Sequence, residues 1–563
     1  MHLHGLWTLA LSLGSLSSLT VPVSARLRDG RLHGNMMRTA AIPVVSTPSP
    51  DIPVVSRNGT VLPPYTTVYE FDQLIDHNNP SRGTFKQRFW HTWEYYLPGG
   101  PIIIMTPGED NADGYSGYLT NRTINGQIAQ QQNGATIVFE HRFYGLSNPL
   151  PDLSVTSLKL HTLQQAIDDI EYFTKNVNLP MPGGDQVTPD KAPWVLVGGS
   201  YSGALTSWTM VNKPGLFAAG YASSAVVEAI LDFWQYFEPV RQNMPANCSA
   251  DVQAVIKKVD TTFLSGNPAA IQAVKDNFGL GSMKHLDDAA GALRNNLWDW
   301  QSLQVTSGPN TGFYKFCDAL EVKDGVSAPA TGWGVDHAFA AWGAYWKNGY
   351  LDGLCDGQDA DDCLGSYNTT QSFWSDTKIN NSNRSWMWIV CNEVGYLQDG
   401  APITSPSLVT RLVQPAYDLR QCQQMFPGIT PVPNTLLTNI KYRGWNVRIK
   451  NLFFANGRRD PWRDATVSAD NLNVPSTAQQ PIGLGDGFHC SDLGTSAGVA
   501  DATILAVQNK ALASIKGWLA VWKPSSNGKP TTRPKSVSAP AQKQPAPVDE
   551  KPLNAWFRNF GKL

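Results

Sequence analysis

One short segment of the sequence has the residue types that a nucleophilic serine requires. The apolar run Val195–Val197 leads directly into a turn of small residues, Gly198–Gly203, with Ser200 at its centre. A strand, a tight turn and a following helix form a nucleophile elbow, which points the serine hydroxyl out of a sheet. We therefore predict Ser200 as a nucleophile and the backbone N–H of Tyr201 as an oxyanion donor. Taken alone, the segment fits an ordinary strand-to-helix turn equally well.

Two later segments supply an acid and a histidine, in the chain order that an elbow serine requires. The apolar run Leu452–Ala455 is followed by a turn that carries Asp460, and His489 lies further along on a glycine-rich loop. In such a triad the imidazole accepts the serine proton and the carboxylate orients the imidazole. Each residue alone has an ordinary explanation, a turn residue before Pro461 or a surface histidine. Their order behind Ser200 favours a triad.

The elements that must position these residues alternate between buried strands and an amphipathic helix. A helix is predicted over residues 161–177, where apolar residues recur at helical spacing. Continuous apolar runs predict strands at 101–105, 135–139, 194–197, 216–222 and 452–455. Such runs are typical of strands that are buried on both faces, so the alternation predicts an α/β class with a mostly parallel, doubly wound sheet. We expect the three side chains to converge above the carboxyl ends of its strands.

The middle of the chain has a different composition. Residues 231–430 contain helical patterns at 251–263 and 269–278, many tryptophans and six of the seven cysteines. We interpret this stretch as a helical cap, stapled by disulfides and inserted between two parts of the core, 66–230 and 431–522. Proximity in the sequence suggests the pairs Cys355–Cys363 and Cys391–Cys422, and the odd count leaves at least one thiol free.

The two ends of the chain indicate export. Residues 1–25 resemble a cleaved signal peptide, residues 26–65 a loose, propeptide-like segment, and residues 523–563 a disordered tail rich in Pro, Ser and Lys. No later stretch is apolar enough for a membrane anchor. We therefore expect a secreted, extracellular glycoprotein, and a lysosome-like compartment is the less favoured alternative. The six glycosylation sequons are Asn58, Asn121, Asn247, Asn368, Asn380 and Asn383.

Composition excludes other classes of function. The formal net charge of −2 gives no positive field for nucleic acid or an anionic membrane. The 19 Trp, 18 Tyr and 21 Phe supply enough apolar surface for a folded core. The sequence has no metal-ligand cluster, phosphate loop or dinucleotide fingerprint, so no cofactor and no metal is expected.

Several motifs together resemble one serine peptidase family, that of prolyl carboxypeptidase, dipeptidyl peptidase II and thymus-specific serine protease, with fungal secreted members nearest. The resemblance covers about residues 66–515 and implies an α/β-hydrolase core. It assigns Ser200 as nucleophile, Asp460 as orienting acid and His489 as base. The sequence departs from the family pattern at Ser202, where many relatives have glycine, and at Cys490, where a second histidine is usual. The motifs are 71–78 with 84–89, 140–145, 198–203, 391–398 and 456–462.

The resemblance also implies cleavage of peptide bonds after proline, through an acyl-enzyme and as a carboxypeptidase. A prolyl endopeptidase or a dipeptidyl peptidase is the alternative within the family; an esterase or a catalytically dead glycoprotein is more distant. Peptides that contain proline are the expected substrates, and a homodimer is one option for assembly. For the second oxyanion donor the family suggests residues 140–145. The speculative pocket residues are Trp462 and Glu393, with Trp386 and Trp388 as weaker candidates, Glu109 or Asp110 for an amine, and Arg458 or Arg459 for a carboxylate.

Overall fold

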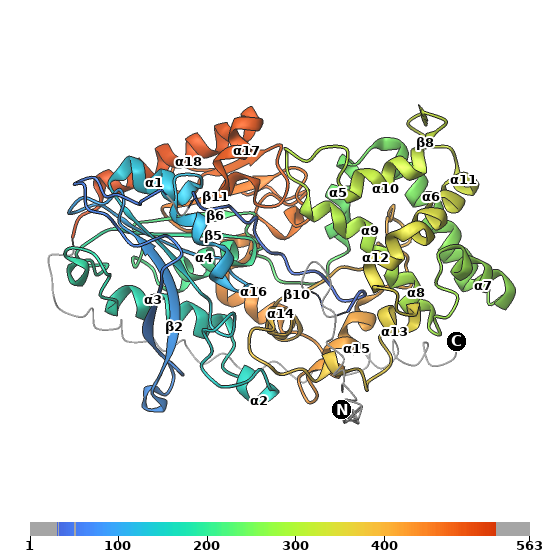
Figure 1. Ribbon diagram of the computed structural model, residues 1–563, viewed down its shortest axis with the longest axis horizontal. Coiled ribbons are helices and arrows are strands. Elements are labelled where there is room, and N and C mark those ends of the chain that lie inside the picture. The colour runs from blue at the N-terminus through green and yellow to red at the C-terminus, as the bar shows by residue number, and fades with distance from the viewer. Residues whose placement is uncertain (1–30, 32, 50–51, 525–563) are drawn as a thin grey trace, which may run out of the picture. The chain divides into compact units, whose positions relative to one another are not determined.

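The computed structural model describes residues 31, 33–49 and 52–524, and its centre is one eight-stranded sheet (Figure 1). β1 pairs antiparallel with β2, and β2 pairs antiparallel with β4. All the remaining neighbours in this sheet are parallel. In spatial order the strands are β1 (Val68–Leu74), β2 (Thr84–Thr92), β4 (Ala135–Phe139), β3 (Ile102–Thr106), β5 (Trp194–Gly199), β6 (Ala219–Ser223), β11 (Leu452–Gly457) and β12 (Ile482–Gly485).

Helices cover both faces of the sheet, which is why its central strands are apolar throughout. Alternate side chains of β3 enter different cores: Ile103 and Met105 pack in one cluster, Ile102 and Ile104 in the other. The first cluster lies under α1 and α18, and α3 and α4 pack on the opposite face (Figure 1). These helices are α1 (Ile124–Gln132), α3 (Leu163–Asn176), α4 (Ser200–Asn212) and α18 (Ala502–Val521).

The predicted fold class is confirmed. The strands expected at 101–105, 135–139, 194–197 and 452–455 correspond to β3, β4, β5 and β11, and the helix expected at 161–177 is α3. The strand expected from residue 216 begins only at Ala219, because Lys213–Leu216 form a turn at the end of α4. Hydrophobicity alone did not separate the apolar end of that turn from the strand.

Most of the stretch between β6 and β11 is helical. It also contains a parallel pair, β7 (Ile230–Asp232) with β10 (Gly395–Leu397), and an antiparallel pair, β8 (Val322–Lys323) with β9 (Val326–Ser327). Its main helices are α5 (Phe237–Asn243), α6 (Ala246–Leu264), α7 (Pro268–Asn277), α8 (Leu286–Ala292), α9 (Arg294–Trp298), α10 (Gly312–Glu321), α11 (Val335–Tyr345), α12 (Leu351–Cys355), α13 (Ala360–Leu364), α14 (Ser382–Ile389), α15 (Pro415–Met425) and α16 (Thr435–Tyr442). Two short helices lie outside it, α2 (Val155–Leu158) and α17 (Thr495–Ala500). The division of the chain into core parts and cap stays a prediction.

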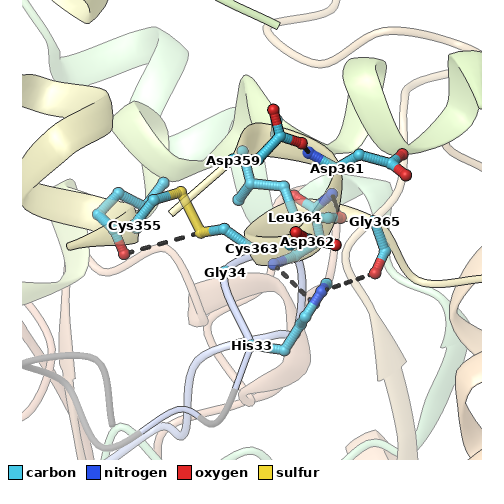
Figure 2. The surroundings of a disulfide bond; sticks show 12 residues. His33, Gly34, Cys355, Asp359, Asp361, Asp362, Cys363, Leu364 and Gly365 are labelled. Carbon is cyan, nitrogen blue, oxygen red and sulfur yellow. Dashed lines mark hydrogen bonds between the residues drawn. A yellow bond between two sulfur atoms is a disulfide. The ribbon is translucent and has the colours of Figure 1, made fainter. Parts of the chain in front are cut away.

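All the disulfides of the described residues lie in this helical stretch. The pairs Cys355–Cys363 (Figure 2) and Cys391–Cys422 are confirmed. A third bond, Cys248–Cys317, joins residues 69 positions apart, and proximity in the sequence could not reveal it. Cys490 is the free cysteine and is buried.

The expectation of a loose segment at 26–65 is wrong for part of the residues that the structure describes. Met36, Met37 and Ala40 belong to one hydrophobic core and Ile42 to the other. Their apolar side chains cost free energy when exposed, so this stretch packs despite its lack of secondary structure. The predicted signal peptide and almost all of the predicted tail lie outside the described residues.

Two surface predictions can be compared with the structure. None of the helices in the described part of the chain is long and apolar enough to cross a membrane. Among the sequons, Asn58, Asn368 and Asn380 are exposed and Asn121 and Asn247 are half-buried. Asn383 is an exception, because it is 3% exposed within α14 and leaves no room for a glycan in the folded chain.

Candidate active site

The turn from β5 into α4 places Ser200 at a sharp corner of the backbone. Ser200 has a φ of 58°, a left-handed conformation that is rare for a non-glycine residue. A Cβ at Gly198 would lie 2.0 Å from the backbone oxygen of Ser202, and one at Gly203 would lie 2.6 Å from that of Ser223. Only glycine fits at both positions. Strain of this kind concentrates at functional sites, and here it holds the serine at the end of a central strand.

Ser202, which departs from the family pattern, has a local structural role. Its hydroxyl donates a hydrogen bond of 2.5 Å to the backbone oxygen of Thr106 and accepts one of 3.2 Å from the N–H of Gly199. These bonds join the first turn of α4 to the ends of β3 and β5. A glycine at this position could make neither bond.

Asp460 and His489 come from the loops after the neighbouring strands β11 and β12. His489 Nδ1 lies 2.8 Å from Asp460 Oδ1, which also accepts a hydrogen bond of 2.9 Å from the Trp462 backbone N–H. Both side chains are buried, with exposed fractions of 2% for His489 and 0% for Asp460. Burial lowers the pKa of His489, but the Asp460 carboxylate and the Cys490 side chain together outweigh it and hold that pKa well above its usual value. The pair can therefore stabilise an imidazolium.

The loops that carry Ser200 and His489 meet. A Cβ at Gly199 would lie 3.1 Å from the Cys490 sulfur, so the residue before the serine contacts the residue after the histidine. Ser200 Oγ is fully buried and has no hydrogen-bond partner among the described residues. His489 Nε2, the ring nitrogen turned away from Asp460, lies 3.3 Å from the backbone oxygen of Ala40.

The loop after β3 packs on the start of α4, beside the backbone of Tyr201. A Cβ at Gly108 would lie 3.2 Å from that of Ser202 and 3.5 Å from the Tyr201 ring. The Tyr201 side chain points elsewhere: its hydroxyl lies 3.0 Å from His141 Nε2, and its ring meets the Trp386 ring edge to face at 5.4 Å. The main chain near Ser200 is thus flanked by the β3 loop, which brings Glu109 into the same region.

An aromatic enclosure lies next to His489, and its members come from three distant segments. The Trp462 ring is 6.2 Å from the His489 ring and is surrounded by Phe233 at 5.7 Å, Tyr236 at 5.3 Å and Tyr396 at 5.5 Å. Sequence analysis singled out Trp462 alone. The other three aromatic rings could not be found from the sequence, because only the fold brings them to this strand end.

Gln301 connects two residues of this enclosure by hydrogen bonds. Its Oε1 accepts hydrogen bonds of 2.9 Å from both Trp462 Nε1 and the Tyr236 hydroxyl. Its amide nitrogen donates one of 2.9 Å to the backbone oxygen of Thr39. No motif marked Gln301 in the sequence.

Comparison with known proteins adds to this geometry. The model of the serine carboxypeptidase S28 family matches residues 73–304 and 333–511. The chain belongs to the serine carboxypeptidase S28 family. It is therefore a serine-type peptidase with an α/β-hydrolase core, as the resemblance implied.

Its relatives include fungal and animal proteins. Serine protease vicPb of Bipolaris victoriae is 36% identical over 75% of this chain and 83% of its own length. A probable extracellular serine carboxypeptidase of Arthroderma benhamiae is 33% identical over 78% of this chain and 64% of its own length. Among solved structures, proline iminopeptidase of Mycobacterium smegmatis is 12% identical, with a TM-score of 0.30 over 79% of this chain and all of its own.

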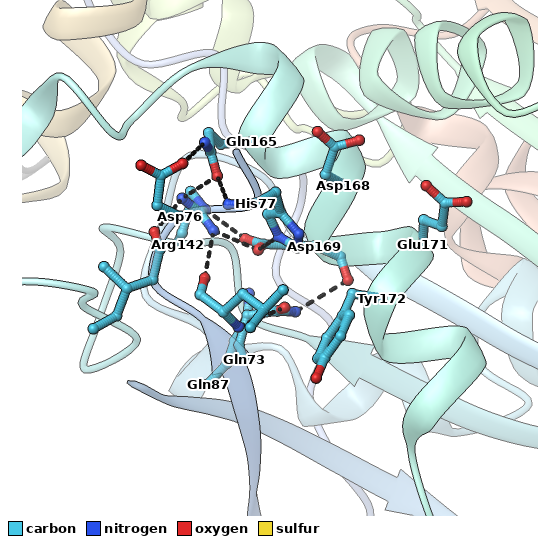
Figure 3. Close-up of polar contacts among 12 residues, drawn as sticks. Gln73, Asp76, His77, Gln87, Arg142, Gln165, Asp168, Asp169, Glu171 and Tyr172 are labelled. Carbon is cyan, nitrogen blue, oxygen red and sulfur yellow. Dashed lines mark hydrogen bonds and ion pairs between the residues drawn. The ribbon is translucent and has the colours of Figure 1, made fainter. Parts of the chain in front are cut away.

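The S28 segment at 140–145, expected to supply an oxyanion donor, holds the core together through buried ion pairs. Arg142 binds the Asp169 carboxylate with nitrogen–oxygen distances of 2.5 and 2.6 Å, and it also binds backbone oxygens after β1 (Figure 3). Glu140 pairs with Arg88 of β2 at 2.6 and 2.8 Å. These side chains connect the antiparallel β1–β2 pair to α3 and to the loop after β4.

The remaining candidates for substrate binding differ in environment. Glu393 is half-buried and accepts a hydrogen bond of 3.0 Å from the Leu163 N–H at the start of α3, and the desolvation of its carboxyl group raises its pKa to about 7. Trp388 is a core residue whose Nε1 donates a hydrogen bond of 2.9 Å to the backbone oxygen of His161. Arg458 is exposed, and Arg459 pairs with Asp486. The role of Glu393 in substrate binding stays a prediction.

Glu109 is an acidic candidate whose carboxyl group interacts electrostatically with His489. Its side chain is buried, and burial raises its pKa to about 8 against smaller lowering effects of its own N–H and of His489. Asp110, its neighbour, receives a hydrogen bond from the Tyr115 hydroxyl at 3.1 Å, and burial raises its pKa as well.

Proposed function

We propose that this S28 peptidase is secreted and cleaves peptide bonds by an acyl-enzyme mechanism in which Ser200, His489 and Asp460 are the catalytic residues. His489 takes the Ser200 proton during attack on the carbonyl and then gives it to the leaving amine. Asp460 fixes the ring tautomer and stabilises the imidazolium. The N–H of Tyr201 and a donor from the loop 107–110 bind the oxyanion.

The observation that carries this proposal is the buried His489–Asp460 hydrogen bond of 2.8 Å, one loop away from a strained serine. The three side chains follow β5, β11 and β12, whose parallel arrangement brings their carboxyl ends to one edge of the sheet. Burying a carboxylate beside a histidine costs desolvation free energy. The imidazolium that forms during general-base catalysis is a charge that this carboxylate would stabilise.

We further propose that the residue before the cleaved bond is proline. Proline has no N–H and a rigid ring, so an apolar slot can select it without leaving a buried donor unpaired. The enclosure of Trp462, Phe233, Tyr236 and Tyr396 beside His489 supports this preference. The names of the family and of the Arthroderma benhamiae relative support a carboxypeptidase.

The triad is tested by labelling the secreted protein with a fluorophosphonate probe. With segment 33–46, whose Ala40 lies against His489, removed from the site, the wild type should be labelled and should cleave a proline-containing peptide, and Ser200→Ala should do neither while keeping its melting temperature. Ser207→Ala is the matched control, since Ser207 is a buried serine on the same helix. Full activity in Ser200→Ala would overturn the assignment.

The substrate preference is tested with one peptide in three forms, with free, amidated or acetylated ends. A carboxypeptidase should release a single residue from the free and the acetylated peptide, and amidation should block it. Blocking by acetylation alone would favour a dipeptidyl peptidase, and cleavage of all three forms would favour an endopeptidase. Replacing proline by alanine should lower kcat/KM at least tenfold.

A further inference from the structure

The N-terminal segment 33–46 crosses the catalytic site on its way from the helical stretch to the sheet. In Figure 1 it is the dark blue thread near β10. It contacts the site at three residues: Thr39 with Gln301, Ala40 with His489, and Ile42 with the position of a Cβ on Gly199, at 2.8 Å. Ala40 is completely buried and Ile42 is 3% exposed. The segment therefore fills the space between the aromatic enclosure and the elbow.

This contact occupies the catalytic histidine. The Asp460 carboxylate lies at Nδ1 of the His489 ring and the Ala40 carbonyl at Nε2, and the Cys490 side chain also faces the ring. Asp460 favours the imidazolium form, and its Nε2–H donates to the Ala40 oxygen. An imidazolium has no lone pair with which to accept the Ser200 proton. The segment thus keeps His489 from accepting the Ser200 proton, and it also fills the space that a substrate would occupy.

The segment is not positioned as a substrate. During attack the carbonyl oxygen of a substrate lies among oxyanion donors, with its carbon facing the serine. The Ala40 oxygen instead accepts from His489 Nε2, the nitrogen that must serve Ser200, and Ser200 Oγ is left without a partner. Ser200 is also completely shielded from solvent. No peptide can reach the triad while the segment is seated.

Anchors on both sides hold the segment in place. On the helical side Asn35 donates to the carbonyls of Leu364 at 2.6 Å and Asp288 at 3.0 Å. His33 lies against the loop of the Cys355–Cys363 disulfide, with its Nε2 at 3.0 Å from the Gly365 oxygen (Figure 2). On the sheet side the Tyr118 hydroxyl donates to the Pro43 carbonyl at 2.7 Å.

The chain becomes accessible just beyond this seat. Val44 is 66% exposed, and Ser46 and Ser49 are exposed as well. Exposed, irregular chain of this kind is where proteases cut. We propose that segment 33–46 is an inhibitory leader and that a proteolytic cut between Ser46 and Ser49 releases it and activates the peptidase. This inference rests on the proposed function, because it concerns access to the same triad.

The test is to insert the recognition sequence of a site-specific viral protease after Ser46 in the full chain. Labelling of Ser200 by the fluorophosphonate probe should be at least tenfold faster after the cut than before it. Asn35→Ala, which removes two anchors, should raise the rate of the cut protein further. A scrambled insertion, which the viral protease does not cut, is the matched control. Equal labelling rates before and after the cut would overturn the proposal that segment 33–46 is an inhibitory leader.

A synthetic peptide of residues 33–46 gives a second test on the cut and purified enzyme. It should inhibit in trans, and the same peptide with Ala40→Trp should not, because Ala40 has no free space around it. The matched control is Val44→Trp, since Val44 projects into solvent. Equal inhibition by all three peptides, or by none of them, would overturn the specific seat.

A third measurement separates this inference from the proposed function. In Ser200→Ala protein, the NMR signals of the His489 ring should shift when the cut removes the Ala40 carbonyl from Nε2. An unchanged ring signal would overturn the leader. If the ring signal changes but the probe does not label the cut wild type, the position of the leader is supported and the catalytic assignment is overturned.

Discussion

At the scale of single residues, the site depends on how His489 is held. Its ring lies 2.8 Å from the Asp460 carboxylate and 6.2 Å from the centre of the Trp462 ring, and nearly all of its surface is hidden from water. In such surroundings a charge interacts more strongly than in solvent, so the carboxylate controls the tautomer and the proton affinity of the ring. The consequences of removing that charge are therefore large.

The first prediction concerns Asp460→Asn. The amide keeps the shape of the side chain but favours the wrong tautomer of His489, so kcat should fall by about 10⁴-fold with little change in KM. Steady-state kinetics on the leader-free enzyme measure this effect. Retention of a tenth or more of the wild-type kcat would show that Asp460 is not the orienting acid.

The second prediction concerns Glu393, whose pKa burial raises to about 7 from 4.5. A raised carboxyl pKa contributes stability below pH 4.5 that is lost as the pH rises through about 7. Glu393→Gln keeps the acceptor for Leu163 and removes the ionisation. The shift corresponds to a free energy on the order of 3 kcal/mol. The wild type should thus lose more melting temperature than the variant between pH 5 and pH 8. Parallel curves would contradict a structural role of the half-buried acid.

Local patterns allowed part of the site to be predicted at this scale. Ser200 and Asp460 each follow an apolar strand, and His489 lies on a glycine-rich loop later in the chain, so their types and order were enough to predict them. No motif in the sequence points to Gln301, Phe233 or Ala40. They reach the site only through tertiary packing, and the burial of Ala40 depends on contacts with residues hundreds of positions away.

At the scale of elements, the strands were easier to predict than the helices. Strands of the parallel sheet are apolar along their whole length, because both faces are covered. Short cap helices such as α9 and α12 are too brief to show a period, and α9 is buried on every side. The β1–β2 pair joins the sheet through the pairing of β2 with β4, and buried charged groups, which hydrophobic patterns do not detect, reinforce the junction.

The third prediction concerns Arg142, which joins the chain after β1 to α3 through Asp169. Arg142→Met leaves a buried carboxylate without its main partner and should lower the free energy of unfolding by about 3–5 kcal/mol. Asp72→Asn is the control, since its pair with Lys86 is exposed and screened by solvent and should contribute little to stability. Urea unfolding of both variants compares them, and equal effects would contradict the clamp.

At the scale of the whole molecule, the cross-links and the sheet occupy separate regions. The three disulfides of the described residues staple the helical stretch, and the eight-stranded sheet relies on its two hydrophobic cores. Helices that pack on a sheet are stabilised by its hydrophobic cores. Short helices joined by long loops are stabilised by disulfides, because these lower the entropy of the unfolded chain.

The fourth prediction compares two of these bonds. Cys248–Cys317 closes 69 residues and Cys355–Cys363 closes 8. Loop-closure entropy predicts losses of about 4 and about 2.5 kcal/mol when each pair is replaced by serines. Urea unfolding of the two double variants measures the difference. A larger loss for the short loop would show that its contact with His33 outweighs the entropy of the unfolded chain.

The route of segment 33–46 has a consequence for the order of events during biosynthesis. The segment leaves the ribosome early, but Asp288, Leu364 and His489, which receive it, are translated hundreds of codons later. It can dock in full only after His489 has emerged. Its docking therefore comes late in tertiary assembly.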